Sequence, residues 1–211
     1  MKTSHALVLA LIVLVELAIS GIEPRDRFTW FLEVAPVLLA LPLIAATWSR
    51  FRWTSLAVVL IALHASILIL GGHYTYAEVP LGFWMQDTFG FARNHYDRIG
   101  HVAQGFVPAL IARELYLRTS PLKRGGWLFF VVTCTCLAIS AFYELVEWWT
   151  AVATGEGATA FLGTQGDVWD TQWDMFLALC GALGSQLLLA RVHDRQLERR
   201  TGDHQTDSRR R

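Results

Sequence analysis

The sequence has no net charge, few cysteines and no cluster of histidines, and each of these absences argues against a class of function. Its 18 basic and 18 acidic residues cancel, so no excess of charge indicates a nucleic-acid partner. Its three cysteines, Cys134, Cys136 and Cys180, lie in apolar stretches and are typical of small core residues, which argues against a disulfide framework or a cysteine metal site. The seven histidines form no HExxH motif or histidine box, so neither a zinc-protease helix nor the di-iron set of a desaturase is predicted.

Apolar residues, in contrast, are abundant. They make up 54% of the 211 residues, nine tryptophans are present and the mean hydropathy is +0.37, which together indicate a membrane protein. A membrane-spanning helix needs roughly 20 apolar residues. The fold class that we expect is therefore all-α, a polytopic membrane helix bundle of about six transmembrane helices. The six predicted spans are Ala6–Ser20, Phe28–Trp48, Trp53–Gly71, Ile99–Tyr116, Gly126–Trp149 and Trp173–Val192.

The first and fourth of these spans are the weakest. Ala6–Ser20 is short and contains Glu16, whereas Ile99–Tyr116 is interrupted by several polar and charged residues. An alternative for the first span is a cleaved signal peptide, because Lys2 precedes an apolar core and Ala18–Ser20 resembles a small-residue cleavage site. Glu16 within that core argues against cleavage, and either alternative leaves the orientation of the other helices unchanged.

The basic residues predict which way the bundle faces. Cytoplasmic segments of membrane proteins are enriched in Lys and Arg. With the N-terminus inside, only Arg25, Arg27, Arg93 and Arg98 fall in outer segments, and the loop Thr150–Gln172 has no Lys or Arg. We therefore expect both termini to be cytoplasmic.

The apolar pattern ends before the C-terminus of the chain. The last residues read TGDHQTDSRRR and show no apolar periodicity. We expect residues 1–195 to form a single transmembrane helical domain and residues 196–211 to form a disordered cytoplasmic tail.

The first polar motif opens the fourth span and reads HYDRIGH, from His95 to His101. If the helix begins near Asp97, then Asp97 and His101 are four residues apart and lie on one face, about one turn into the membrane. A carboxylate and an imidazole then point the same way. The alternative is structural, with Asp97 capping the helix and His101 hydrogen-bonded in the core.

The second polar motif, FYELVEWW, ends the fifth span. Glu144 and Glu147 are three residues apart and share a helix face, and Trp148 and Trp149 suit the aromatic belt at the outer interface. An unpaired acid at the centre of a span costs about 2.5–3.5 kcal/mol, so the deeper Glu144 is expected to face the bundle interior, a cavity or a cation. The alternative for Glu147 is exposure to water at the interface.

The third polar motif, GTQGDVWDTQWD, leads into the sixth span. Asp167, Asp170 and Asp174 have offsets of three and seven, which line one stripe of a helix. Asp167 also fits a capping pattern, so a structural role is an alternative for it. Asp174 opens the apolar run in which Gly181 and Gly184, with Ser185, predict close packing against a neighbouring helix.

Three helix ends thus bring carboxylates and a histidine to the outer face at a similar depth. These groups repel one another unless they are protonated or neutralised, so a positive partner is expected among them. The candidates are Arg93 and Arg98, protons, or a divalent metal ion such as Mg²⁺, Mn²⁺, Ca²⁺ or Zn²⁺. Glu33, in the outer half of the second span, is a weaker addition to the cluster. The candidate catalytic residues are Asp97, His101, Glu144, Glu147, Asp170 and Asp174, and the candidate metal ligands are the same set without Glu147.

Several polar motifs between Gly72 and Arg195 resemble those of the YjdF-like inner-membrane proteins of bacteria. They are HYTYAEVP, RNHYDRIGH, FVPALIARE, FYELVEWW and LGTQGDVWDTQWDMFLAL. The resemblance implies a multi-pass protein of the cell inner membrane.

More distantly, the chain resembles VanZ-like proteins, which are associated with glycopeptide-antibiotic resistance and the cell envelope. Their pattern has a D-(K/R)-x-x-H helix start, a helix with a Glu and a later acidic stretch before G-x-x-G. This chain has Glu147 where the VanZ-like pattern usually has Gln, so a shared chemistry is not implied. The matching positions here are Asp97, Arg98, His101, Glu144, Asp170, Asp174, Gly181 and Gly184.

Three hypotheses for function follow. In the first, the acidic cluster belongs to a metal-dependent enzyme or binding protein that acts on a lipid-linked or cell-envelope substrate, by holding a divalent cation or by acid/base chemistry. In the second, the protein is a small proton-coupled transporter or channel, which needs a polar path onward to the cytoplasm. In the third, it is a structural membrane partner whose acids neutralise Arg93 and Arg98. The expected partner is membrane lipid or a lipid-linked small molecule, and no nucleic acid.

Overall fold

The structure, a computed structural model, describes residues 3–155 and 159–208, and within these ranges it is helical apart from the connecting loops. No strand occurs in the described part of the chain. The elements are α1 (Thr3–Ser20), α2 (Arg27–Thr47), α3 (Ser55–Tyr74), the 3-10 turn η1 (Tyr76–Glu78), α4 (Pro80–Phe89), α5 (Tyr96–Thr119), α6 (Gly126–Thr154), α7 (Thr159–Leu162) and α8 (Asp170–Ser208).

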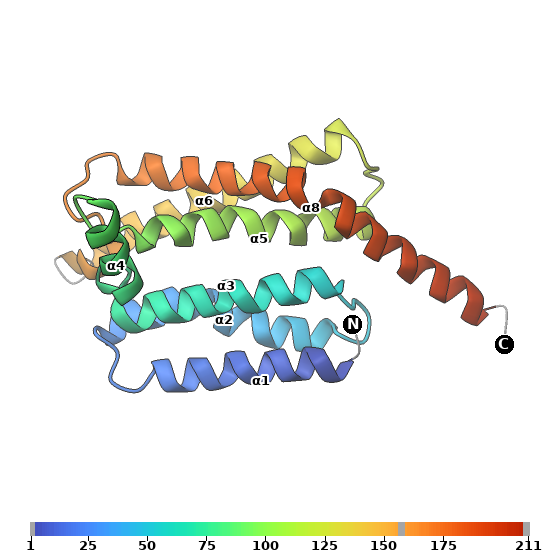
Figure 1. Ribbon diagram of the computed structural model, residues 1–211, viewed down its shortest axis with the longest axis horizontal. Helices are drawn as coiled ribbons and strands as arrows, with labels where there is room; N and C mark the ends of the chain where they lie inside the picture. Colours follow the sequence, from blue (N-terminus) through green and yellow to red (C-terminus); the bar gives the residue numbers. More distant parts are fainter. Residues whose placement is uncertain (1–2, 156–158, 209–211) are drawn as a thin grey trace.

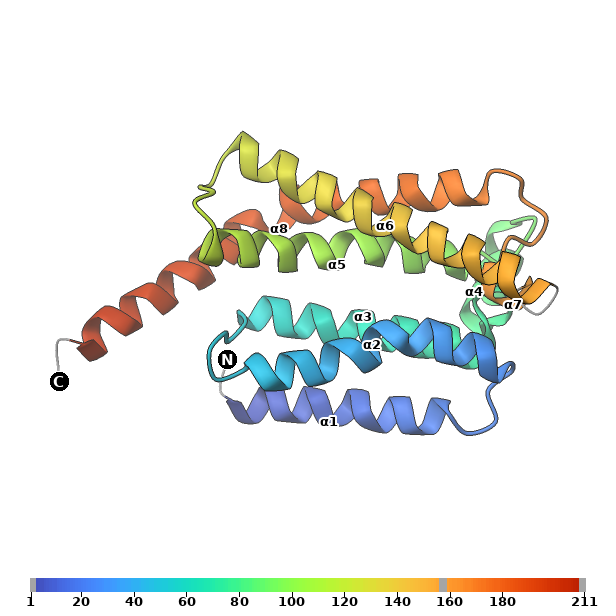
Figure 2. The same cartoon turned by 180° about the vertical axis from the view of Figure 1, so that it is seen from behind.

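The long helices lie side by side, and both ends of the chain lie at the same end of the bundle (Figures 1 and 2). We call this the terminal end, and we call the opposite end, where α4 and α7 lie, the far end. Among the described residues, α1, α2, α3, α6 and α8 are long and apolar enough to span a membrane. The prediction of an all-α polytopic membrane bundle is confirmed, while the cytoplasmic location of the terminal end stays a prediction.

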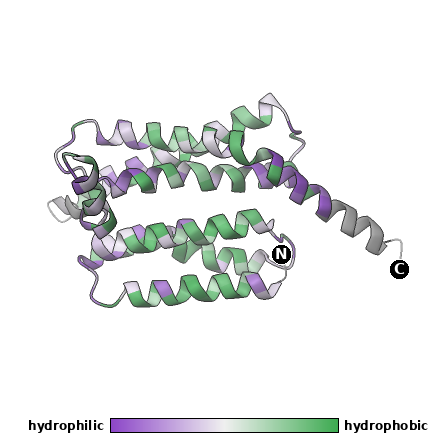
Figure 3. Cartoon of the chain, viewed as in Figure 1, coloured by the Kyte–Doolittle hydropathy of each residue, from purple (hydrophilic) through white to green (hydrophobic). Residues whose placement is uncertain are grey.

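The fourth predicted span, α5, differs from the other long helices in composition. It has 24 residues, but charged residues lie near both of its ends. It nevertheless occupies the middle of the bundle, where it packs against α3, α6 and α8. Figure 3 shows the same trend for the whole bundle, with hydrophilic residues gathered toward the two ends and hydrophobic residues along the helices between them.

The last helix continues beyond the predicted domain boundary. The backbone of α8 is helical to Ser208, through most of the segment for which the sequence predicts a disordered tail. Gln196, Leu197, Glu198 and Arg199 are good helix formers, which favours continuation of the helix. Glu198 also accepts a hydrogen bond from Arg124 in the loop before α6.

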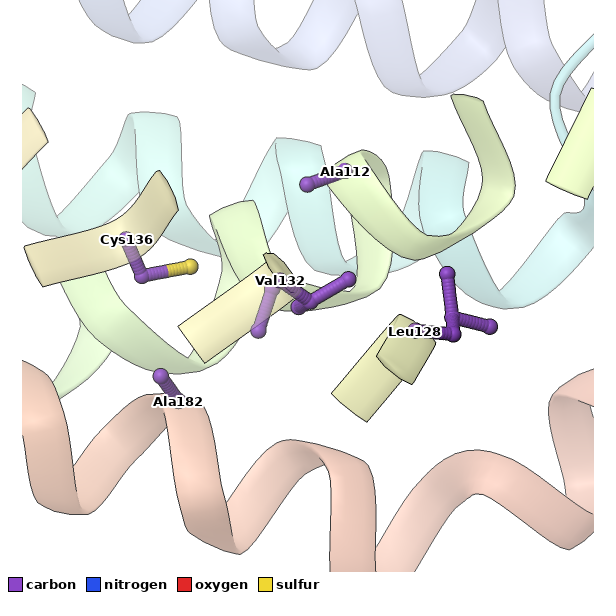
Figure 4. Close-up of a cluster of buried hydrophobic side chains, with 6 residues drawn as sticks. Ala112, Leu128, Val132, Cys136 and Ala182 are labelled. Atoms are coloured by element: carbon purple, nitrogen blue, oxygen red, sulfur yellow. The ribbon is translucent and has the colours of Figure 1, made fainter. Parts of the chain in front are cut away.

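The bundle consists of two packed halves. In the first, Val13 of α1, Val34 and Val37 of α2, and Ala65 and Ile69 of α3 form a buried cluster. The second half joins α5, α6 and α8, and its side chains point toward one another between these helices (Figure 4). The residues of this second cluster are Ala109, Ala112, Leu128, Val132, Cys136 and Ala182.

Two glycines let α5 and α8 approach closely. A Cβ atom at Gly105 would lie 1.8 Å from the carbonyl oxygen of Ala178, and one at Gly181 would lie 2.2 Å from that of Val102. These distances are far below van der Waals contact, so the backbones meet only because both side chains are absent. A Cβ at Gly184 would meet nothing closer than 4.0 Å. The predicted close packing is therefore present at Gly181 and is not required at Gly184.

Candidate functional site

The site begins where α5 starts at the far end. Asn94, which is 2% exposed, accepts a hydrogen bond from the amide of Tyr96 and donates one to the carbonyl oxygen of Val79, so it ties the helix start to the loop before α4. Tyr96 donates from its hydroxyl to the carbonyl oxygen of Ile67 in α3. These bonds fix the direction in which the first turn of α5 presents Asp97 and His101.

His101 lies between two carboxylates. Its Nε2 atom is 3.3 Å from Oδ1 of Asp97, one helical turn earlier, and 3.7 Å from Oδ1 of Asp174 on α8. Asp97, His101 and Asp174, which we call the Asp–His–Asp group, each offer one ligand atom, and these atoms lie within 4.8 Å of one another. The four-residue spacing in the sequence predicted the Asp97–His101 pair, and the close approach of α5 and α8 at Gly105 and Gly181 brings Asp174 to it.

The other ring nitrogen of His101 has a partner on its own helix. Nδ1 lies 2.9 Å from Oε1 of Gln104, which can only accept a hydrogen bond, so Nδ1 carries a proton. Nε2 then either carries a second proton or has a lone pair directed at the two carboxylates. Metal-binding histidines almost always donate their second ring N–H to an oxygen in this way, and the hydrogen bond fixes the tautomer.

Two buried carboxylate oxygens at this site have no hydrogen-bond partner in the described part of the chain. They are Oδ1 of Asp174, a residue 3% exposed, and Oε1 of Glu144, a residue 8% exposed. Glu144 extends from α6, has Thr171 as a hydrogen-bonding neighbour and lies near enough for its charge to act on His101. Buried polar atoms are normally paired, and an unpaired carboxylate is especially costly, so both oxygens indicate a missing cation or proton.

Glu147 and Glu33 face a small cavity beside the Asp–His–Asp group. This cavity, which we call the polar cavity, has a volume of about 180 Å³, and Asp97, His101 and Gln104 also line it. Glu33 of α2 is 6% exposed and accepts a hydrogen bond of 3.4 Å from the hydroxyl of Tyr143. The sequence offered only a weak signal for Glu33, which was an isolated acid in an apolar span.

Asp170 has a different environment from the other predicted ligands. Its Oδ1 is 2.6 Å from Arg93, which also contacts Asp167 at 3.2 Å, and Asp167 in turn lies 3.0 Å from Arg98. Arg98 also lies over the ring of Trp173, 5.0 Å from its centroid. Asp170 lies outside the Asp–His–Asp group, and this geometry favours an ion pair for it over the predicted metal ligation.

The arginines at the rim therefore neutralise only part of the acidic cluster. Among the described residues, no ion pair joins Arg93 or Arg98 to Asp97, Glu144 or Asp174. Burial and the two nearby arginines lower the pKa of His95, so its imidazole stays neutral at pH 7 and adds no positive charge. Apart from His101, the inner acids have no positive partner among the described residues.

The comparisons with known proteins agree with this architecture. A family model described as "Predicted membrane protein (DUF2238)" matches residues 5–195. The chain belongs to this family. It is 52% identical over 196 residues to the inner membrane protein YjdF of Escherichia coli (strain K12). The aligned region covers 93% of this chain and 92% of that protein. No solved structure matches.

This member of the DUF2238 family is thus a multi-pass protein of the inner membrane, as its motifs and spans predicted. The family match covers all four helices that contribute to the site, because α2, α5, α6 and the apolar part of α8 lie within residues 5–195. The match and the YjdF relative give the compartment, and the chemistry of the site has to be argued from its residues.

A second buried polar network in this DUF2238 protein lies at the terminal end. Arg113 donates to Nδ1 of His193 at 2.9 Å, so Nε2 of His193 carries the proton that it donates to Glu114 at 3.1 Å. Thr54 donates to Glu114 from both its amide and its hydroxyl, and Arg118 pairs with the same carboxylate at 2.8 Å. The sequence did not predict this network, in which Thr54 and His193 lie about 60 to 80 residues from their partners in the chain. Because these groups satisfy one another, the network differs from the inner acids at the far end.

Proposed function

We propose that the Asp–His–Asp group, together with Glu144, binds one divalent cation, and that the protein uses this cation to bind or transform a lipid-linked or cell-envelope substrate at the far end. The observation that carries the proposal is the pair of buried, unpartnered oxygens on Asp174 and Glu144 beside an imidazole whose other nitrogen is held by Gln104. One imidazole and several carboxylates suit Mn²⁺ or Zn²⁺, and with more oxygen ligands Mg²⁺.

The polar cavity gives such a cation a place to act on substrate. A divalent cation polarises a phosphoryl or carbonyl oxygen and lowers the pKa of a bound water molecule. Asp97 and His101 line both the cavity and the proposed metal site, so a substrate oxygen in the cavity would lie next to the cation. Glu147 and Glu33 line the same cavity and are candidates for the general base.

Elemental analysis of the protein purified in mild detergent tests the proposal. We expect about one divalent metal ion per chain in the wild type and none in the double variant Asp174→Asn, Glu144→Gln. The matched control is Glu16→Gln, a carboxyl in a span outside the site, whose Oε2 accepts a hydrogen bond from Ser66. Because glutamine keeps an acceptor there, the control should retain the metal. A metal-free wild type whose melting temperature does not rise with Mg²⁺, Mn²⁺ or Zn²⁺ would contradict the proposal.

The transporter hypothesis has less support, because the described residues of α5 offer no continuous polar path from the site to the terminal end. The buried residues of α5 between Gln104 and the Arg113 network are small or apolar. Gln186 of α8 donates to the hydroxyl of Thr133 and to the carbonyl oxygen of Phe129, so it is engaged in packing α8 against α6. A proton relay would have to cross this apolar stretch.

A further inference from the structure

A second and larger cavity adjoins the polar cavity. We call it the apolar cavity; its volume is about 460 Å³, and it lies between α1, α2 and α3 on one side and α5 on the other. Its size falls in the range of small-molecule sites, about 300–1,000 Å³. Val13, Leu41, Leu68 and Ile111 are typical of its walls.

The two cavities share part of their walls. Pro36, His64, Leu68 and Pro108 line both of them. Pro36 and Pro108 lie inside α2 and α5, where a proline removes a backbone hydrogen bond and loosens the local helix packing. Because the polar cavity lies toward the far end and the apolar cavity toward the terminal end, a ligand that spans this junction would touch polar residues at one end and apolar residues at the other.

His64 marks the junction with a free polar atom. Its Nε2 atom is buried and has no hydrogen-bond partner in the described part of the chain. The indole nitrogens of Trp48 and Trp53, which line the opposite end of the apolar cavity, are likewise buried without partners. From Pro36 to Trp48 the cavity follows α2 for about 18 Å at 1.5 Å per residue, which is more than half of the roughly 30 Å of bilayer hydrocarbon.

The apolar cavity also reaches the lipid-facing surface. Leu7 of α1 and Leu43 of α2 line it, and each of them is 65% exposed. A hydrocarbon chain could thus enter sideways from the bilayer between these two helices, without passing through water.

We propose that the two cavities together bind one amphiphile, a lipid phosphate with a single hydrocarbon chain in the apolar cavity and its phosphate in the polar cavity. This inference rests on the proposed function, because Glu33, Asp97 and Glu147 line the polar cavity and would repel a phosphate unless a divalent cation lies between them. The hydrocarbon chain contributes affinity through apolar contact, and the cation gives preference for the phosphate. His64 is placed to hydrogen-bond the first polar atom of the amphiphile.

Binding of hexadecyl phosphate to the full-length protein in lipid nanodiscs, with hexadecanol as the uncharged comparison, tests the inference. Ala40→Phe on α2 fills the apolar cavity, whereas Ala46→Phe on the same helix is the matched control on an exposed position that does not line it. We expect one hexadecyl phosphate per wild-type chain in the presence of the metal, at least tenfold weaker binding of both amphiphiles by Ala40→Phe, and no change for Ala46→Phe.

The variant Asp174→Asn separates the two proposals. It should bind hexadecanol as the wild type does but lose the preference for the phosphate, while Ala40→Phe should keep its metal. Equal binding by Ala40→Phe and the wild type overturns the amphiphile site even if the metal is present. If binding depends on Ala40 but the wild type shows no preference for the phosphate with any divalent ion, the apolar cavity still binds a hydrocarbon chain. That result overturns the phosphate assignment and counts against the metal site.

Discussion

At the scale of single residues, the hydrogen bond between His101 and Gln104 is the feature most readily separated from the rest of the site. Gln104 is not a ligand of the proposed cation. It acts on the cation through the imidazole of His101, whose tautomer and orientation it fixes. Gln104→Leu should therefore weaken metal binding by about 10–100-fold without removing a ligand. Gln104→Glu keeps an acceptor oxygen and should restore most of the affinity. Titration of the metal-depleted protein with Mn²⁺ or Zn²⁺ measures both effects, and unchanged affinity in Gln104→Leu would argue that His101 does not bind the metal.

Two aspartates one helical turn apart on α8 should behave differently. Asp170 pairs with Arg93, whereas Asp174 faces His101. We expect Asp170→Asn to keep the metal and to lower stability, because a hydrogen bond to a charged group is worth about 1.5–3 kcal/mol, and each kcal/mol shifts the melting temperature by roughly 2–4 °C in a chain of this size. Asp174→Asn should lose the metal. Metal content and thermal unfolding of the two variants measure this difference, and metal loss in Asp170→Asn would restore Asp170 as a ligand.

At the scale of elements, the contact between α5 and α8 decides whether the site is assembled. Gly181→Ala places a Cβ against the Val102 carbonyl, whereas Gly184→Ala on the same helix has room for one. Overpacking of this kind costs about 1–3 kcal/mol and separates the helices. Gly181→Ala should therefore lower both the melting temperature and the metal affinity, and Gly184→Ala should change neither. Thermal unfolding and metal titration of this pair provide the measurement; equal behaviour would show that the close contact is not needed for the site.

The elements also show what could be read from the sequence. Apolar length predicted the long helices, and the spacing of Asp97 and His101 predicted the pair that shares a face, because both depend only on neighbours along one helix. The sequence could not assign partners across the bundle. It named Arg93 as a candidate partner for the acidic cluster, but Arg93 contacts Asp167 and Asp170 more than 70 residues later, so the sequence could not show which acids it pairs with and left Asp170 among the ligands. Glu33 was weakly predicted for the same reason, since only the packing of α2 against the far end brings it to the polar cavity.

At the scale of the whole molecule, the two ends of the bundle have different polar chemistry. The network around Glu114 at the terminal end is built from complementary partners that join α5, α8 and the start of α3. The far end keeps carboxylate oxygens without partners. A bundle whose buried charged groups are paired at one end and whose acids are unsatisfied at the other is suited to chemistry at one membrane face rather than to passage through the membrane.

The membrane face at which this chemistry takes place depends on the orientation of the whole chain. The scarcity of Lys and Arg in the far-end segments predicts that the site opens on the outer face of the inner membrane. In a variant whose three native cysteines are replaced by alanine, Val168→Cys, at a position 85% exposed before α8, should react with a membrane-impermeant maleimide added to intact cells with a permeabilised outer membrane. Pro121→Cys, at an exposed position between α5 and α6, should react only after the inner membrane is opened. The reverse pattern would place the site on the cytoplasmic face, and the lipid phosphate would then have to come from the inner leaflet.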